Sequence, residues 1–124
     1  MPLFDGPTPI QRLNRFGEAL GGNVAVYAKR DDLMGLGGGG NKRRKLKFLL
    51  GEAKANACDT FITVGGVQSN HARLTAAACA QAGLDCELVL TRVVPRTDEV
   101  YERSGNVLLD ELFGARVHVF FRAY

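Results

Sequence analysis

The hydrophobic positions in the first half of the chain follow two helical patterns separated by a short apolar run. Residues 10–20 carry apolar side chains at helical spacing and end at two glycines, which predicts a first helix. Residues 24–28 predict a short strand. Asn41 is a candidate N-cap for a second helix that continues to Ala55. The apolar stripe of this helix consists of Leu46, Leu49, Leu50 and Ala53.

The second half of the chain alternates between short apolar runs and helical patterns. Strands are predicted over residues 60–64, 86–91 and 117–121. Helices are predicted between them, over residues 70–82 and 105–113. Strands that alternate with helices pair in parallel through right-handed crossovers. We therefore predict an α/β fold, an open three-layer parallel sheet with crossover helices.

The size and composition of the chain fit one ordinary globular domain. It has 124 residues, of which 46% are hydrophobic and 23% are charged, and its net charge is only +3. This small charge does not call for a nucleic-acid partner, and no apolar run is long enough to span a membrane. The first residues also lack a continuous apolar signal segment. We expect a cytoplasmic protein that binds neither nucleic acids nor membranes.

Cysteine and histidine do not form a metal-binding or redox pattern in this sequence. The three cysteines, Cys58, Cys79 and Cys86, are odd in number and lack a C-x-x-C spacing. We expect three reduced, buried thiols, with Cys79 in an alanine-rich core segment. The two histidines, His71 and His118, are far apart in the sequence, so no metal site is predicted.

A glycine-rich segment leads directly into the second predicted helix. Five glycines lie within residues 35–40, and Lys42 and Lys45 follow three positions apart on one helix face. A glycine loop before a helix presents free backbone N–H groups and the positive end of the helix dipole, which suits a phosphate. The dipole disfavours a charged amine at Lys42, and a neutral lysine amine attacks carbonyl groups to form a Schiff base. A solvated basic face or a nucleic-acid patch is the alternative interpretation of these lysines.

A second polar segment follows the strand predicted over residues 60–64. Two glycines end this strand, and four polar residues then open the next helix: Gln68, Ser69, Asn70 and His71. Ligands bind at the carboxyl ends of strands in open α/β sheets, and the hydroxyl, amide and backbone N–H groups here suit a carboxylate. The simpler interpretation is that Ser69 or Asn70 only caps the helix. One cap accounts for one of these residues and not for all four.

Taken together, the motifs NKRRKL and GGVQSNHAR resemble the pyridoxal-phosphate enzymes of the tryptophan-synthase-β-like fold, also called fold type II. The segments GPTPIQRL, AKRDDLMGL and GNVLLDELFGA extend the resemblance over almost the whole chain. Within this fold the chain resembles the branch that contains D-cysteine desulfhydrase, 1-aminocyclopropane-1-carboxylate deaminase and L-cysteate sulfo-lyase. The resemblance implies a lyase that uses pyridoxal 5'-phosphate and acts on a small amino-acid substrate.

The resemblance also implies roles for individual residues in cofactor binding. Lys42 matches the lysine that binds pyridoxal phosphate covalently, and Asn41 precedes it in the same cofactor-binding motif. Lys45 matches a lysine that contacts the phosphate. Asn70 matches the asparagine that hydrogen-bonds the hydroxyl group of the cofactor ring.

Substrate binding is implied for the polar segment that contains Asn70. Ser69 matches a catalytic serine that contacts the substrate carboxylate, and Gln68 and His71 lie beside it. Family members that open the cyclopropane ring tend to carry glutamine at the position of His71, whereas desulfhydrases and sulfo-lyases carry histidine. This position favours D-cysteine desulfhydrase, which forms pyruvate, sulfide and ammonia, over 1-aminocyclopropane-1-carboxylate deaminase or L-cysteate sulfo-lyase.

The chain departs from the family pattern in length and in its glycine loop. Family members are well over twice as long, so we expect the N-terminal part of a longer, homodimeric enzyme, with the 124-residue chain inactive by itself. Residues 1–50 would belong to the larger domain of the family fold, and residues 51–124 to an incomplete smaller domain. Gly37 and Gly38 replace bulkier residues, which predicts a looser loop. An inactive fragment or a small basic binding module is the alternative from another class.

Overall fold

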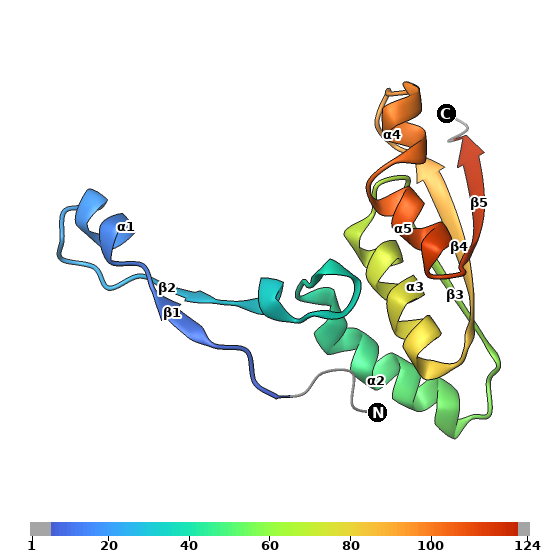
Figure 1. Cartoon of the computed structure of the whole chain (residues 1–124), viewed down its shortest axis with the longest axis horizontal. Coiled ribbons are helices and arrows are strands. Elements are labelled where there is room, and N and C mark those ends of the chain that lie inside the picture. The colour runs from blue at the N-terminus through green and yellow to red at the C-terminus, as the bar shows by residue number, and fades with distance from the viewer. Residues whose placement is uncertain (1–5, 122–124) are drawn as a thin grey trace.

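The computed structural model describes residues 6–121. Its central element is a parallel sheet of three strands in the order β3–β4–β5. These strands are β3 (Thr60–Gly66), β4 (Asp85–Arg92) and β5 (Arg116–Phe121). Figure 1 shows the strands side by side, with helices in front of one face of the sheet. The predicted α/β class and the parallel pairing are confirmed, and each of these three strands is one or two residues longer than predicted.

Three helices build the layer beside the sheet. The two long ones are α2 (Lys42–Ala55) and α3 (Asn70–Ala82), with the bounds that the sequence predicts. The shorter α5 (Asn106–Leu112) lies within the predicted residues 105–113. Helix α3 packs on β3 and β4, α5 packs on α3 and β5, and α2 packs on α3. A further short helix, α4 (Glu99–Arg103), forms within the connection between β4 and α5.

The core lies between the sheet and these helices because the alanine-rich face of α3 allows close packing. Nine residues of α3 are buried, six of them alanine or cysteine. Two leucines of α2, Leu46 and Leu50, and two of β4, Leu88 and Leu90, are fully buried against this helix. Leu49, which the predicted stripe included, is instead 41% exposed because it lies outside the face that meets α3.

The N-terminal segment forms an arm rather than the predicted first helix. Strand β1 (Ile10–Arg12) pairs antiparallel with β2 (Tyr27–Lys29), and the helix α1 (Asn14–Ala19) is only six residues long. The helical spacing at residues 10–12 is therefore overridden by backbone pairing with residues that follow much later. Figure 1 shows this arm extending away from the body of the molecule. Two single-turn 3-10 helices, Asp31–Leu33 and Leu36–Gly38, connect the arm to α2.

The second face of the sheet carries apolar side chains that none of the described helices covers. Ile62 and Val64 of β3 are 67% and 69% exposed, and Phe120 of β5 is 54% exposed. Within residues 6–121, no helix has both the length and the apolar character needed to cross a bilayer.

The three cysteines are free thiols, as predicted, but they are not all buried. Cys79 in α3 and Cys86 in β4 lie in the core, whereas Cys58 is exposed. The expectation of a buried thiol is wrong for Cys58, which follows the end of α2, before β3 begins.

Candidate active site

The two candidate lysines are exposed at the start of α2. Lys42 is the first residue of this helix and Lys45 lies one turn further on. Neither lysine has an acidic partner among the residues that the structure describes. Asn41 occupies the N-cap position, but its backbone is already helical and its side chain makes no capping hydrogen bond. The predicted capping role of its side chain is therefore wrong, and its carboxamide is exposed beside Lys42.

The glycine loop is packed against α3 and is not the looser loop predicted from Gly37 and Gly38. A Cβ atom on Gly37 would lie 2.8 Å from Cβ of Ala77, and one on Gly38 would overlap the guanidinium of Arg73. Both glycines also have positive φ angles, of 61° and 78°. The backbone N–H of Gly40 donates to the carbonyl of Asp31 at 2.9 Å. The backbone conformation favours glycine at both positions, and the contact with Ala77 also leaves little space for a side chain at Gly37.

The polar segment after β3 begins with a helix cap. Ser69 is the N-cap of α3, and its Oγ accepts a hydrogen bond from the backbone N–H of Ala72 at 3.2 Å. The residue opposite is Gly65, where a Cβ atom would lie 2.7 Å from Oγ of Ser69. The capping interpretation of Ser69 is confirmed, and its catalytic role stays a prediction. Ser69 is half-buried, and Asn70 next to it is exposed.

Gln68 connects this segment to the start of α5. Its Nε2 donates to the carbonyl oxygens of Tyr101 and Ser104, at 2.5 and 2.9 Å, and its Oε1 accepts from the backbone N–H of Asn106 at 2.9 Å. Both N–H bonds of the Gln68 amide are therefore used within the protein. These contacts support the turn, and the contact of Gln68 with substrate stays a prediction.

Asn106 is a site residue that sequence reasoning missed. Its Nδ2 donates to the backbone carbonyl of Gln68 at 2.8 Å and to Oδ1 of Asn70 at 3.0 Å. The carboxamide of Asn70 is therefore oriented by Asn106, from a helix that starts more than 30 residues later in the sequence. The signal was present in the motif GNVLLDELFGA, which begins with Gly105 and Asn106.

His71 is held by hydroxyl groups on both sides of its ring. Its Nε2 lies 3.0 Å from Oγ1 of Thr63 and its Nδ1 lies 3.5 Å from Oγ1 of Thr75. The hydroxyl of Thr75 donates its hydrogen to the backbone carbonyl of His71 at 2.8 Å, so it can only accept from the ring. We therefore assign the hydrogen of a neutral ring to Nδ1, with Nε2 accepting from Thr63.

The electrostatic environment of His71 shows that the two candidate segments lie near each other. Burial lowers the pKa of His71, and the charges of Lys45 and Lys42 lower it further. The two lysines of α2 therefore lie within electrostatic range of the first turn of α3, as the packing of these helices requires. His71 is neutral at neutral pH because each of these effects disfavours the imidazolium form.

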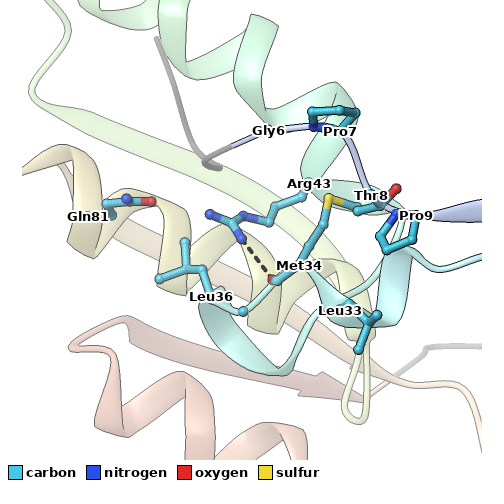
Figure 2. A pocket seen from close by; sticks show the side chains of 10 residues that line it. Gly6, Pro7, Thr8, Pro9, Leu33, Met34, Leu36, Arg43 and Gln81 are labelled. Atoms are coloured by element: carbon cyan, nitrogen blue, oxygen red, sulfur yellow. Dashed lines mark hydrogen bonds between the residues drawn. The ribbon is translucent and has the colours of Figure 1, made fainter.

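A cavity of about 430 Å³ lies on another side of α2, away from the candidate residues. Figure 2 shows the guanidinium of Arg43 in its wall, where Nη1 donates to the carbonyl of Met34 at 2.8 Å. Leu36, Gln81 and residues 6–9 contribute to the same wall. None of the residues predicted to bind cofactor or substrate lines this cavity. Among the described residues, no group of three or more histidine, cysteine or acidic side chains has the arrangement of a metal site.

Comparison with known proteins places the chain in one family. Residues 1–124 match the family described as "Pyridoxal-phosphate dependent enzyme". The chain belongs to this family. The family uses pyridoxal phosphate, so the cofactor predicted from the sequence is confirmed at the level of the family.

Several relatives of this chain within the family have the same name. The 1-aminocyclopropane-1-carboxylate deaminase of Bradyrhizobium diazoefficiens is 50% identical over 119 residues, which are 95% of this chain and 35% of that protein. The protein of the same name from Mesorhizobium japonicum is 51% identical over the same shares. The chain thus spans about a third of the length of these relatives.

Solved structures support the fold of this family member. The crystal structure of an ACC deaminase homologue has a TM-score of 0.83 and 45% identity, over 96% of this chain and 34% of that one. A pyridoxal 5'-phosphate-dependent aspartate racemase has a TM-score of 0.61 at 20% identity, over 90% of this chain and 32% of that one. The second likeness concerns the fold alone.

Proposed function

We propose that this chain supplies the lysine side of an active site that uses pyridoxal phosphate to break a bond in a small amino acid. One observation carries this proposal. Lys42 and Lys45 are exposed cations without an acidic partner among the described residues, and their charges act on His71 in the first turn of α3. Such a pair of amines beside a helix N-terminus is suited to an anionic cofactor that also carries an aldehyde.

The donor set at this place fits pyridoxal phosphate. The amine of Lys42 would bind the aldehyde carbon, and the ammonium of Lys45 would pair with the phosphate. The exposed carboxamide of Asn70, oriented by Asn106, offers a hydrogen bond to a ring hydroxyl. When bound, the cofactor supplies an electron-withdrawing ring that stabilises negative charge at the substrate α-carbon.

The side chains of this chain then control protons and position the substrate. The amine of Lys42 would move the proton that the reaction requires. In D-cysteine or L-cysteate this proton is on the α-carbon, whereas in 1-aminocyclopropane-1-carboxylate, whose α-carbon carries no hydrogen, it is on a ring methylene carbon. The N-terminus of α3 attracts the substrate carboxylate, and the hydroxyl of Ser69 lies at that helix end. Neutral His71 contributes a dipole without adding positive charge. Gln68 supports the turn through its hydrogen bond to the carbonyl of Tyr101.

Two different observations favour two different substrates. The names of the relatives favour 1-aminocyclopropane-1-carboxylate, whose ring opening and deamination give 2-oxobutyrate and ammonia. The histidine at position 71 favours D-cysteine, whose breakdown gives pyruvate, sulfide and ammonia. We propose the first as the primary substrate, because the identity of about 50% extends over 95% of the chain, whereas the second rests on one side chain. L-cysteate, which would release sulfite, is the third substrate to compare.

The role of Lys42 is tested by trapping the cofactor with borohydride and mapping the modified peptide by mass spectrometry. We expect labelling at Lys42 in the complete gene product, and loss of that label together with turnover in Lys42→Ala. The matched control is Lys54→Ala, which changes an exposed lysine at the far end of the same helix and leaves both unchanged. A label that persists at full level on another lysine in Lys42→Ala contradicts the assignment.

The substrate is tested by product analysis with the same preparation. 2-Oxobutyrate from 1-aminocyclopropane-1-carboxylate supports the primary proposal, and sulfide with pyruvate from D-cysteine supports the second. Sulfite from L-cysteate identifies a sulfo-lyase. A preparation that labels at Lys42 but converts none of the three excludes all of these substrates and leaves the lysine assignment standing.

A further inference from the structure

Arg73 connects α3 to the glycine loop that precedes Lys42. It lies in the second turn of α3, where it is only 9% exposed. Its Nη1 donates to the carbonyl of Gly37, and its Nη2 donates to the carbonyl of Gly39 at 3.3 Å. One guanidinium therefore holds two carbonyl groups of the loop. Two residues separate the second carbonyl from Lys42, so the position of Arg73 affects the start of α2.

Asp110 lies in α5, and it is fully buried. The end of α5 is close to the loop, because a Cβ atom on Gly37 would lie 3.8 Å from Cε2 of Phe113. Neither oxygen of its carboxylate has a hydrogen-bond partner within the described part of the chain, and the same holds for Nε of Arg73. Helix α5 packs directly on α3, and the charge of Arg73 acts on the carboxylate. A buried acid and a buried arginine thus attract each other between facing helices, in surroundings where charges are weakly screened.

We propose that Asp110 is a positioning residue for the lysine site, because its carboxylate restrains the Arg73 guanidinium that holds the glycine loop. Its effect on catalysis rests on the proposed function, whereas its effect on the loop does not. The glycine-rich sequence fits this arrangement, since a side chain at Gly38 would displace the guanidinium.

The charged groups around Asp110 determine when this restraint operates. Burial raises the pKa of Asp110 to about 7, the charge of Arg73 on α3 opposes the rise, and Glu111 on its own helix adds to it. From β4, Cys86 also lies within electrostatic range of the carboxylate. The carboxylate is therefore charged above about pH 7 and neutral below it, and Arg73 is attracted only in the charged form.

Hydrogen–deuterium exchange of the loop tests this proposal without cofactor. We expect exchange in a peptide covering residues 35–41 to be several-fold faster in Asp110→Asn than in the unmodified protein. The matched control is Glu111→Gln, which removes the adjacent, exposed acid and leaves the loop unchanged. Arg73→Lys, which retains the charge but loses the two-pronged donor, is expected to accelerate exchange as well. Unchanged exchange in Asp110→Asn overturns the proposal, even where Arg73→Lys changes it.

A pH profile separates positioning from a purely structural role. We expect the ratio of borohydride-trapped label on Lys42 to that on Lys54 to rise several-fold across neutral pH. This rise should persist in Glu111→Gln and disappear in Asp110→Asn. If Asp110→Asn fails to fold, the unmodified protein decides the question, because its loop exchange, corrected for intrinsic rates, must slow across the same range. Equal profiles in all variants overturn the proposal. Absence of a specific label on Lys42 refutes the proposed function instead, and the loop exchange still decides the role of Asp110.

Discussion

The buried carboxylate of Asp110 predicts an unusual dependence of stability on pH. Burial raises its pKa from the ordinary 3.8 to about 7, because the charged form loses its hydration and gains no hydrogen bond among the described residues. The folded state therefore binds more protons than the unfolded state between these two values. Where this holds, the free energy of unfolding falls as pH rises, and it is constant again above about pH 7.

The magnitude of this fall follows from the size of the pKa difference. Each pKa unit corresponds to ~1.4 kcal/mol, so the full difference corresponds to ~4 kcal/mol. Local relaxation and water penetration reduce such penalties in real proteins, which gives an expected fall of about 2–4 kcal/mol. Asparagine has nearly the same shape as aspartate and does not titrate. Asp110→Asn therefore removes this pH-dependent part of the free energy of unfolding while preserving the volume of the side chain.

Urea unfolding followed by circular dichroism measures the effect. The informative quantity is the free energy of unfolding of the unmodified chain minus that of Asp110→Asn, since contributions from other titrating groups cancel. We expect this difference to fall by about 1–3 kcal/mol between about pH 5 and about pH 8, because about two of the pKa units lie in this range. The same difference taken with the control Glu111→Gln should fall far less, because Glu111 only adds to the rise in the pKa of Asp110 that burial causes. A flat or rising difference for Asp110→Asn refutes the reasoning.

Three further predictions concern the site and the surface. Gly65→Ala places a Cβ atom 2.7 Å from Oγ of Ser69, so we expect a loss of about 1 kcal/mol from the displaced cap and weaker labelling of Lys42, measured by unfolding and by borohydride trapping. His71→Gln is expected to change the ratio of products from D-cysteine and 1-aminocyclopropane-1-carboxylate more than it changes labelling of Lys42; an unaltered ratio removes the argument from His71. The 124-residue chain is expected to self-associate with rising concentration in light scattering, because the sheet face around Ile62 is exposed, and Ile62→Lys should reduce this association.

Much of the local structure was determined by the sequence itself. The alanine-rich pattern of residues 70–82, with Ser69 before it and Gly83 after it, predicts α3 to the residue. The spacing of Leu46 and Leu50 similarly predicts α2 and the face that it buries. These predictions succeed because caps, helical spacing and left-handed glycines act over a few residues. The alternation of strands and helices then determined the parallel sheet, and short motifs led to the family and to Lys42.

Interactions between distant segments were decided only by the tertiary structure. Residues 10–12 have a helical pattern, yet they form β1 because β2 supplies hydrogen-bond partners that the sequence does not place beside them. Asn106 joins the site because α5 packs on α3 and brings its first residue to Gln68. The restraint of the glycine loop by Arg73, and the burial of Asp110 next to it, also depend on this packing. Local patterns report the preferences of neighbouring residues, whereas hydrogen bonding and desolvation of distant polar groups are determined only when the helices and strands are assembled.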